Sequence, residues 1–441
     1  MRIAIAGFGA EGQSSYRYFT ARGDDVTIVT TKISDQYPIP ADAKAIVSDD
    51  AFDRLANFDL VLRTPPMPPQ SIRTRGKIWS QTNEFFATCP APIIGVTGSK
   101  GKGTTSSFIA EIMKAHITHD SENNGRRVHL VGNIGVPALD ILDSVRTEDI
   151  VVFELSSFQL WDLERSPAVA VMTLLEPDHL DVHTDMAEYV TAKSQIFAHQ
   201  IPRDFAVYNE QDDRVRQLVE NALRTTHATG LPFLNKKFVH IEERVFYYAD
   251  QEIGSTEIVT LPGEHNLRNA AAAIAATWHM TNGDVEAIRR GLGSFTGLPH
   301  RLKLVETIND IKFYDDSIAT TPGSAIAAIR SFDAPTILIL GGHDKGADYT
   351  ELGQAINKST VKMIYTIGAN RDKIETQVRA VSDIPIKKLN TSAMTEIVHE
   401  VYQAATPGDI VILSPAAASF DMFTSYKDRG DQFIAAVKGL C

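Results

Sequence analysis

Cysteine is scarce in this sequence: Cys89 and Cys441 are the only two among 441 residues. Neither has a Cys or His neighbour at the spacing of metal ligands, so the sequence offers no disulfide framework and no zinc site. A run of the roughly 20 apolar residues that a membrane helix requires is also missing. The apolar start is interrupted by Gly7, Gly9 and Glu11 before a signal peptide could form. A cytoplasmic protein without membrane insertion is expected.

Basic residues are in the minority, since 43 Lys and Arg stand against 55 Asp and Glu and give a formal net charge of -12. Nonspecific nucleic-acid binding needs clustered basic residues that displace counterions from phosphates, so nucleic acid is not an expected partner. The composition, 43% hydrophobic and 22% charged, is typical of a globular protein. Because a single core rarely serves a chain of this length, we expect two or three domains.

Short β-branched segments alternate with helical patterns along the whole chain, which is typical of parallel sheets covered by helices. Strands are expected at 3–6, 26–30, 60–62, 93–96, 150–153, 336–340, 363–367 and 410–413. The first segment ends near Cys89-Pro90, after a proline-rich stretch at 64–69, and a glycine-rich stretch at 291–297 ends the second. The sequence therefore predicts an α/β protein with domains at 1–90, 91–297 and 298–441.

The first glycine cluster places Gly7, Gly9 and Gly12 directly after a predicted strand, in the pattern G-x-G-x-x-G. In this pattern the backbone amides at a helix start face a pyrophosphate. A nicotinamide enzyme also needs an acidic residue at the end of the second strand, but this strand runs out as Thr-Thr-Lys at 30–32. Two interpretations remain: a tight turn without a ligand, or a site for a diphosphate other than NAD.

A second glycine cluster follows the strand predicted at 93–96 and precedes a helical stretch at 106–115, where a phosphate-binding loop belongs. Lys102 would neutralise the β- and γ-phosphates, and a hydroxyl at the helix start would bind Mg²⁺. Gly103 stands where the usual pattern has Ser or Thr, so Thr104 is the expected hydroxyl. A solvated Gly/Lys loop is the alternative. The candidate ATP-binding residues of this loop are Gly98, Ser99, Gly101, Lys102, Gly103, Thr104 and Thr105.

Further polar residues follow predicted strands, where ligands of α/β sheets collect. Glu154 follows the strand at 150–153, and Mg²⁺ prefers oxygen ligands, so this carboxylate is a candidate metal ligand. His179 alone would more often be structural, but Asp178, Asp181 and His183 surround it. We therefore include His179 in the candidate site. A cap on the following helix is the alternative role for the residues around it.

The motifs together resemble the Mur ligase family over essentially the whole chain. The strings in family order are Thr-Gly-Ser-Lys-Gly-Lys at 97–102, Gly-Asn-Ile-Gly at 132–135, Glu-Leu-Ser-Ser-Phe-Gln at 154–159, Asp-His-Leu-Asp at 178–181, Gly-Glu-His-Asn at 263–266 and Leu-Pro-His-Arg at 298–301. Strings at 314–320, 340–345, 413–420 and 426–430 resemble the members that join D-glutamate to UDP-N-acetylmuramoyl-L-alanine. The Lys-Gly-Lys-Gly-Thr loop is also similar to folylpolyglutamate synthase, a relative with the same ATP chemistry.

The resemblance implies a Rossmann-like N-terminal domain for UDP, a central P-loop-type ATPase domain and a Rossmann-like C-terminal domain for the amino acid. It also implies ATP and Mg²⁺, with Lys102, His179, Lys193 and Lys345 as catalytic residues. Lys193 matches a lysine that CO₂ carbamylates, which would add a metal ligand to Thr104, Glu154 and His179; a surface lysine is the alternative. The remaining implied contacts are Asn266, Arg301 and Asp316 with the nucleotide, Gly9, Gly12, Thr64 and Asn133 with the UDP-sugar substrate, and Thr320, Lys345, Ser419 and Phe420 with the amino acid.

Two positions depart from the family pattern. The segment 64–69 replaces a usual Ser-Pro-Gly, and Ile318 stands where a Lys is usual. The expected activity is ATP-dependent ligation of D-glutamate through an acyl phosphate by a monomer. Another Mur ligase, a folylpolyglutamate synthase-like ligase, a nicotinamide-linked oxidoreductase and a noncatalytic nucleotide-binding protein are the alternatives.

Overall fold

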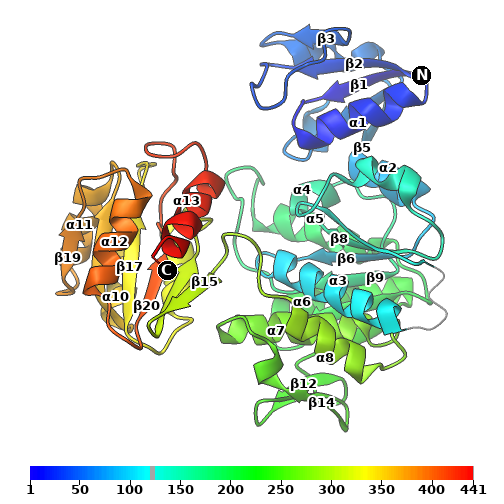
Figure 1. Ribbon diagram of the computed structural model, residues 1–441. Helices are drawn as coiled ribbons and strands as arrows, with labels where there is room; N and C mark the ends of the chain where they lie inside the picture. The colour runs from blue at the N-terminus through cyan, green and yellow to red at the C-terminus, as the bar shows by residue number, and fades with distance from the viewer. Residues whose placement is uncertain (120–124, 441) are drawn as a thin grey trace. The chain divides into compact units, whose positions relative to one another are not determined.

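The computed structural model describes residues 1–119 and 125–440, which form three β-sheets with flanking helices (Figure 1). The α/β class is confirmed. Two compact units are distinguished, one made of residues 1–258 and 267–295 and the other of 259–266 and the chain from 296 onward. The first sheet ends before the second begins at residue 93, and the third begins at residue 303. The domain boundaries at 90 and 297 stay predictions.

The first sheet is fully parallel, with the strand order β3-β2-β1-β4-β5. Because the order reverses between β1 and β4, their carboxyl ends form the crevice where such sheets bind ligands. Side chains alternate between two cores: Ile3 and Ile5 lie in one, Ala4 and Ala6 in the other. The elements are β1 (Arg2–Ala6), α1 (Ala10–Ala21), β2 (Asp25–Thr30), β3 (Lys44–Val47), η1 (Ala51–Asn57), β4 (Leu60–Arg63), η2 (Pro69–Ser71), β5 (Lys77–Ser80) and α2 (Gln81–Thr88).

The second sheet has the order β14-β13-β12-β11-β10-β9-β6-β8-β7. It is parallel from β7 to β12, whereas β13 and β14 are antiparallel, an addition that the sequence did not predict. Its strands are β6 (Ile93–Thr97), β7 (Val128–Gly132), β8 (Ile150–Glu154), β9 (Val169–Met172), β10 (Phe205–Asn209), β11 (Thr229–Phe233), β12 (Val239–Glu242), β13 (Val245–Tyr248) and β14 (Gln251–Ser255). Its helices include α3 (Lys102–His119), α4 (Ser157–Leu160), α5 (Met186–Ala198), α6 (Asp213–Thr226), α7 (Glu264–Thr277) and α8 (Val285–Ser294), with short turns η3 (Ala138–Asp140), η4 (Leu142–Ser144) and η5 (Thr256–Ile258).

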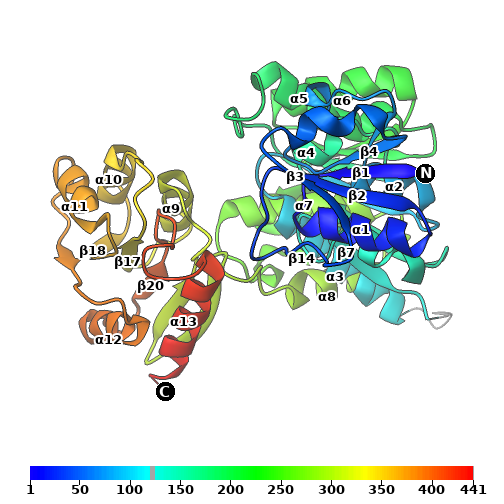
Figure 2. The same ribbon diagram turned by 90° about the horizontal axis from the view of Figure 1, so that it is seen from above.

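The third sheet has the order β15-β16-β20-β17-β18-β19 and is parallel except for the edge strand β15. Helices α9, α10 and α11 cover one face, and α12 and α13 cover the other (Figure 2). Strand β17 is buried on both faces, as expected for a central parallel strand. The elements are β15 (Lys303–Ile308), β16 (Ile311–Asp315), α9 (Pro322–Ile329), β17 (Thr336–Gly341), α10 (Thr350–Asn357), β18 (Val361–Ile367), α11 (Arg371–Arg379), β19 (Ile386–Lys388), α12 (Met394–Ala404), β20 (Ile410–Leu413) and α13 (Tyr426–Lys438).

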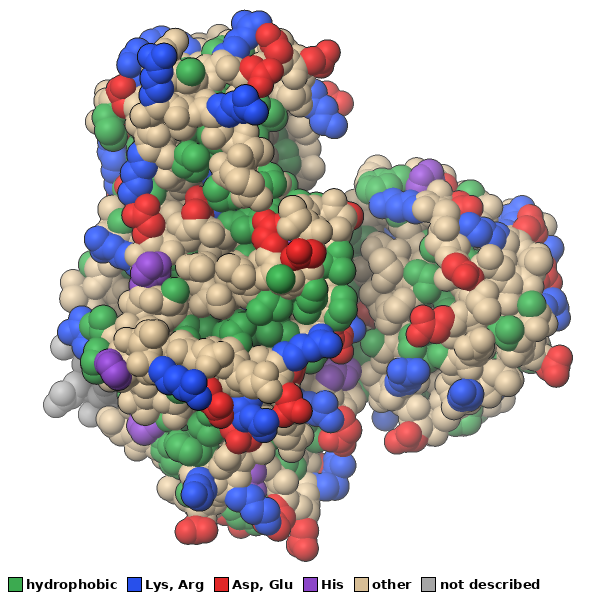
Figure 3. Space-filling view, turned by 180° about the vertical axis from the view of Figure 1, so that it is seen from behind, with side chains coloured by type: hydrophobic (Ala, Val, Ile, Leu, Met, Phe, Trp, Pro, Cys, Tyr) green, Lys and Arg blue, Asp and Glu red, His purple; other side chains and the backbone are tan. Residues whose placement is uncertain are grey.

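The surface carries both signs of charge. Basic and acidic side chains are interspersed over the face that Figure 3 shows. Within residues 1–119 and 125–440, no helix combines the length and apolar character needed to cross a membrane.

Candidate active site

The phosphate loop joins β6 to α3, so the predicted order of strand, loop and helix is observed. Gly98 and Gly101 have φ angles of 147° and 84°. A Cβ atom would lie 2.0 Å from the Thr173 Oγ1 atom at Gly98 and 2.3 Å from the Asn269 Oδ1 atom at Gly101. Only glycine satisfies both the backbone conformation and the close approach at these positions. The loop is therefore held tightly against neighbouring segments, at the carboxyl end of a central strand.

Two lysines converge on the carbonyl of Gly98. The Lys102 amine donates hydrogen bonds to the carbonyls of Gly98 and Ser99, each at 3.0 Å. Lys193 comes from α5, and its amine donates to the Gly98 carbonyl at 2.8 Å and to the Thr97 hydroxyl at 3.4 Å. The structure thus places two lysine side chains beside the loop, one from each of two helices.

Lys193 is buried, with 1% of its surface exposed, so the alternative of a surface lysine is wrong. Burial lowers the pKa of Lys193 well below its usual value, and the nearby charge of Lys102 lowers it further. The carboxylates of Asp178 and Glu154 act in the opposite direction, which shows that both lie within electrostatic range of this amine. The amine also lies 4.8 Å from the centre of the Tyr189 ring.

The hydroxyls of the loop differ in their surroundings. The Ser99 hydroxyl accepts from the Glu176 amide at 2.9 Å, donates to the Glu176 carbonyl at 2.8 Å and contacts the Tyr189 hydroxyl at 2.8 Å. Thr105 Oγ1 is buried and has no hydrogen-bond partner among the described residues. Thr104 is 6% exposed. The Ser99 side chain therefore fastens the loop to the segment after β9, and the role of Thr104, in the first turn of α3, as the metal hydroxyl stays a prediction.

Asn133 and Glu154 lie side by side at the carboxyl ends of the neighbouring strands β7 and β8. The Asn133 amide nitrogen donates to the Glu154 carbonyl at 3.2 Å, and its side chain donates to Glu154 Oε1 at 3.4 Å. Gly132 makes this approach possible, since a Cβ atom there would lie 2.2 Å from the Glu154 carbonyl oxygen. The structure brings these two predicted residues together.

His179 occupies an exposed turn with a φ angle of 54°. Its ring lies 3.5 Å from Asp178 and 5.0 Å from the ring of Phe158. His183, in contrast, is buried, stacks on Phe158 and shares a hydrogen bond of 2.9 Å with the Ser157 hydroxyl. The suggestion that a residue around His179 caps the next helix is wrong, because Asp185 caps α5. The half-exposed ring of His179 is accessible to a ligand.

The oxygen atoms of Glu154 and of the loop hydroxyls suit a metal ion that is bound together with a nucleotide. Within the described residues, no three His, Cys, Asp or Glu side chains lie close enough to enclose a metal ion. Mg²⁺ takes several ligands from phosphates and water in such sites and needs only one or two carboxylates. Glu154 and a loop hydroxyl provide that kind of incomplete oxygen set.

The crevice of the first sheet brings together the residues predicted to bind UDP. Gly9 precedes α1, and Gly12 is buried in its first turn. The Thr64 hydroxyl donates to the Ala6 carbonyl at 2.9 Å, and a Cβ atom at Gly7 would lie 2.2 Å from the Thr64 hydroxyl. The glycine turn and the start of the proline-rich segment therefore meet at the switch point between β1 and β4.

Sequence reasoning missed two charged residues in this crevice. Arg63, the last residue of β4, is fully buried and pairs with Asp162. Glu11 accepts a hydrogen bond of 2.7 Å from Gln159, and its burial raises its pKa to about 7. The isolated Arg before the proline-rich segment was the available signal, but its partner lies 99 residues further along the chain.

The second unit carries the predicted nucleotide contacts Asn266, in α7, Arg301, before β15, and Asp316. Asp316 follows β16 and accepts hydrogen bonds from the Ser414 hydroxyl at 2.7 Å and the Leu302 amide at 3.1 Å. Burial raises the pKa of Asp316 to about 7, while the charge of the exposed Arg301 acts against this shift. Asn266 donates to the Pro262 carbonyl at 2.7 Å. Asp316 and Arg301 are thus brought into electrostatic range of each other.

The predicted amino-acid contacts lie on the loops after β16, β17 and β20, which are adjacent strands. The Lys345 amine lies 5.7 Å from the centre of the Phe420 ring, and both side chains are exposed. Ser419 is buried at 2% exposure, and Thr320 is partly buried. Ile318, which replaces a usual Lys, is also partly buried. The structure therefore brings Lys345 and Phe420 together on the loops that follow β17 and β20.

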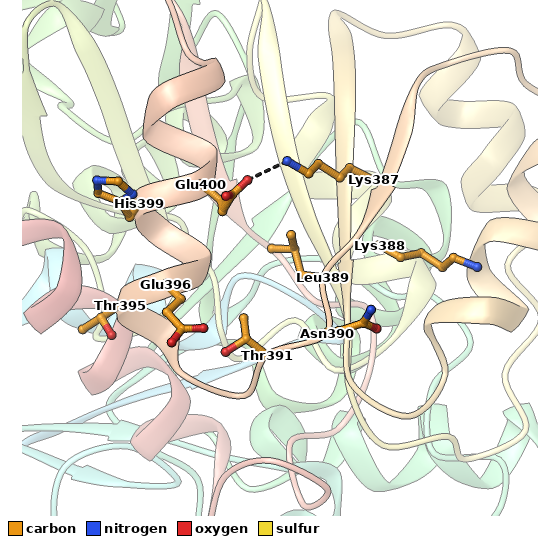
Figure 4. Close-up of a pocket in the computed structure, with 9 residues that line it drawn as sticks. All are labelled: Lys387, Lys388, Leu389, Asn390, Thr391, Thr395, Glu396, His399 and Glu400. Carbon is orange, nitrogen blue, oxygen red and sulfur yellow. Dashed lines mark hydrogen bonds and ion pairs between the residues drawn. The ribbon is translucent and has the colours of Figure 1, made fainter.

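The surface has two depressions, and they differ in their relation to the predicted site. A groove of about 610 Å³ lies between β19 and α12, where Lys387 and Glu400 form an ion pair, and it contains none of the predicted site residues (Figure 4). A second, of about 460 Å³, includes residues 174–176, the segment that Ser99 holds. Only the second adjoins the phosphate loop.

Comparison with known proteins gives consistent results. Residues 96–277 match the model of the Mur ligase middle domain, and residues 300–417 match that of the Mur ligase, glutamate ligase domain. A UDP-N-acetylmuramoylalanine--D-glutamate ligase from Acetivibrio thermocellus is 36% identical, with 100% of this chain and 96% of the relative covered. The protein of the same name from Symbiobacterium thermophilum is also 36% identical, with 100% and 98% covered.

Solved structures share the fold. The UDP-N-acetylmuramate-alanine ligase from Thermotoga maritima superposes with a TM-score of 0.59 at 16% identity and covers both chains completely. Folylpolyglutamate synthase from Mycobacterium tuberculosis also has a TM-score of 0.59, at 15% identity, with 82% of this chain and 94% of that one covered. The full-length identity to the curated relatives is decisive for the family. The chain belongs to the Mur ligase family and is an ATP-dependent ligase.

Proposed function

We propose that this enzyme joins D-glutamate to UDP-N-acetylmuramoyl-L-alanine in the synthesis of peptidoglycan precursors, with ATP and Mg²⁺. The observation that carries the proposal is the 36% identity, over the whole chain, to proteins named for this reaction. The convergence of Lys102, Lys193 and Glu154 around the phosphate loop supports the chemistry. A cytoplasmic location and a monomeric state stay predictions.

The phosphate loop would bind the ATP phosphates. Its glycines allow close approach of the backbone, Lys102 would neutralise charge on the β- and γ-phosphates, and the start of α3 favours an anion. Mg²⁺ would be held by Glu154, Thr104 and His179, and when bound it would spread the negative charge of the transferring phosphoryl group. Lys102 and the loop amides act by position and charge, since the reaction needs no nucleophile from the protein.

The reaction proceeds in two balanced steps. A carboxylate oxygen of the UDP-linked substrate attacks the γ-phosphorus, the bond to the ADP oxygen breaks, and an acyl phosphate forms. The amino group of D-glutamate then attacks the acyl carbon and loses a proton, while the C–O bond breaks and phosphate leaves. Asn133, beside Glu154, would orient the substrate next to the transferred phosphoryl group.

The other contacts are assigned by their place in the fold. Gly9, Gly12 and Thr64 would bind the UDP portion at the switch point of the first sheet. Lys345 would pair with the side-chain carboxylate of D-glutamate, with Thr320 and Ser419 as hydrogen-bond donors and Phe420 as an apolar wall. Asn266, Arg301 and Asp316 would contact the nucleotide.

The test is phosphate release with ATP, Mg²⁺ and UDP-N-acetylmuramoyl-L-alanine against a panel of D- and L-amino acids. D-glutamate should be preferred. Turnover with L-alanine, L-lysine or diaminopimelate but not with D-glutamate indicates another Mur ligase, and turnover with folate acceptors indicates the folylpolyglutamate synthase alternative. NAD(P)H binding would support an oxidoreductase, and absence of ATP turnover with every acceptor a noncatalytic protein.

A further inference from the structure

Arg63, at the end of β4 in the first sheet, forms a buried ion pair with Asp162, which follows α4. Its Nε atom donates to Asp162 Oδ2 at 2.8 Å, and its Nη2 atom donates to Asp162 Oδ1. Its Nη1 atom donates to the Pro65 carbonyl at 3.4 Å. The Arg63 side chain is 0% exposed. Two parallel hydrogen bonds between a guanidinium and a carboxylate fix both the distance between the groups and their relative orientation. This pair therefore fixes the position of the end of β4 relative to the segment after α4.

The side-chain amides of Asn83 and Gln159 make further hydrogen bonds at the same contact. The Asn83 side chain donates to the Asp162 carbonyl at 2.8 Å and accepts from the Glu164 amide at 2.9 Å. Gln159, at the other side of Asp162, donates to Glu11 at 2.7 Å. Because the Asn83 side chain bonds two backbone groups, the Asp162 carbonyl and the Glu164 amide, it fixes the register of this segment against the first domain segment, and the Gln159–Glu11 bond adds a side-chain contact.

The proline-rich segment has a second anchor. Gln70 donates to Glu188 Oε1 at 3.1 Å, and the Trp161 indole donates to the same oxygen at 3.1 Å. The other oxygen of Glu188 accepts from the amide and hydroxyl of Thr184, at 2.6 and 2.8 Å. Thr184 follows the turn that carries His179. One carboxylate thus connects Gln70, directly after the proline-rich segment, with Trp161, directly after α4, and with the end of the turn that carries His179.

We propose that Arg63, with Asp162, is a positioning residue that holds the UDP crevice in fixed register with the phosphate loop. The inference rests on the proposed function. One substrate would then be held at its UDP end by the first sheet and would react at its carboxylate beside the second sheet. The relation of the two sheets decides whether the carboxylate reaches the phosphoryl group, and a misplacement of about 1 Å can cost roughly a hundredfold in rate.

Exposed ion pairs join the same parts of the chain and provide a matched control. Arg17 contacts both oxygens of Asp140 at 2.8 Å, but its side chain is 56% exposed. Solvent-exposed pairs of this kind contribute little to position or stability. Arg63→Met and Arg17→Met therefore remove the same chemical group from a buried and an exposed contact that each join residues 1–90 to the chain after residue 91.

The experiment compares the complete substrate, UDP-N-acetylmuramoyl-L-alanine, with a truncated substrate, N-acetylmuramoyl-L-alanine, that has no UDP to bind. With the complete substrate, kcat/KM of Arg63→Met should fall roughly ten- to hundredfold. With the truncated substrate, Arg63→Met and the wild-type enzyme should be equal. Arg63→Lys should recover part of the loss, and Arg17→Met should match the wild type with both substrates.

An equal loss with both substrates would show that Arg63 serves the fold alone and would overturn the inference. Should Arg63→Met not fold, the double change Arg63→Met with Asp162→Leu replaces it, because it leaves no buried charge unpaired. If this double variant behaves like Arg17→Met with both substrates, the inference is overturned as well. A wild-type enzyme that ligates only substrates without UDP contradicts the proposed function itself, which is a different result.

Discussion

Replacing Lys193 by alanine tests whether this buried amine becomes a carbamate. An ordinary lysine, with a pKa near 10.4, has about one neutral amine in a thousand at pH 7.4, and each unit by which the pKa falls raises that fraction about tenfold. Burial and the charge of Lys102 lower the pKa of Lys193 well below the usual value. CO₂ reacts with the neutral amine: an N–C bond forms, the nitrogen loses a proton, and a carboxylate results. The environment of Lys193 therefore favours carbamylation.

The expected loss follows from the contacts of this amine. It donates to the Gly98 carbonyl at 2.8 Å. A hydrogen bond from an uncharged group contributes about 0.5–1.5 kcal/mol. A carbamate would add a negative charge facing the metal, and the remainder of the loss is expected from that charge. We expect kcat of Lys193→Ala to fall about a hundredfold or more, equivalent to about 2.7 kcal/mol. Lys114→Ala, which removes an exposed lysine of α3, should leave kcat unchanged.

The assay is ADP formation with and without added acetate or bicarbonate. Acetate should restore part of the activity of Lys193→Ala by occupying the space of the carbamate, and labelled bicarbonate should give a carbamate signal in the wild type only. Lys193→Gln keeps a donor for the Gly98 carbonyl. It should nevertheless be inactive. Normal activity of Lys193→Ala, or a loss that carboxylates and bicarbonate never change, would refute the reasoning.

Three further predictions follow from single contacts. Lys102→Ala should reduce ADP formation at least about a hundredfold with an unchanged unfolding transition, and near-normal ADP formation would remove Lys102 from the site. Lys345→Ala should raise the KM for D-glutamate and leave that for ATP unchanged, with the exposed Lys358→Ala as control; equal effects on both KM values would contradict its role. Because burial raises the pKa of Asp316 to about 7, its contribution to stability is present below the unfolded pKa, near 4, and is lost as pH rises through 7. Asp316→Asn should flatten the pH dependence of the free energy of unfolding over this range, measured by urea denaturation, and an unchanged slope would refute the assignment.

Local patterns made much of the architecture and the phosphate loop predictable. Strands β1, β6 and β20 were expected within one residue of their observed ends, because buried β-branched runs bounded by glycine or polar residues leave little choice. The loop requires positive φ angles at Gly98 and Gly101, which glycine adopts readily, so the glycine pattern in the sequence predicts the loop conformation. Such features depend on neighbours in sequence.

Features that depend on distant partners were not predictable. The contact of Arg63 with Asp162 joins residues 99 positions apart, and the burial of Lys193 depends on how α5 packs beside β6. The β12–β13 hairpin was missed for another reason. Its turn residues Glu243 and Arg244 both have positive φ angles, at 48° and 61°, without the Asn or Gly that usually marks such a turn. Tertiary pairing of the strands overrides the local preference there.

The acyl-phosphate route is tested most directly by following an oxygen atom. UDP-N-acetylmuramoyl-L-alanine labelled with heavy oxygen in its alanyl carboxylate is incubated with ATP, Mg²⁺ and D-glutamate, and the released phosphate is analysed by mass spectrometry. The mechanism predicts that each phosphate carries one oxygen from the carboxylate, because the C–O bond breaks when the amine attacks. Ligated product accompanied by unlabelled phosphate would contradict it.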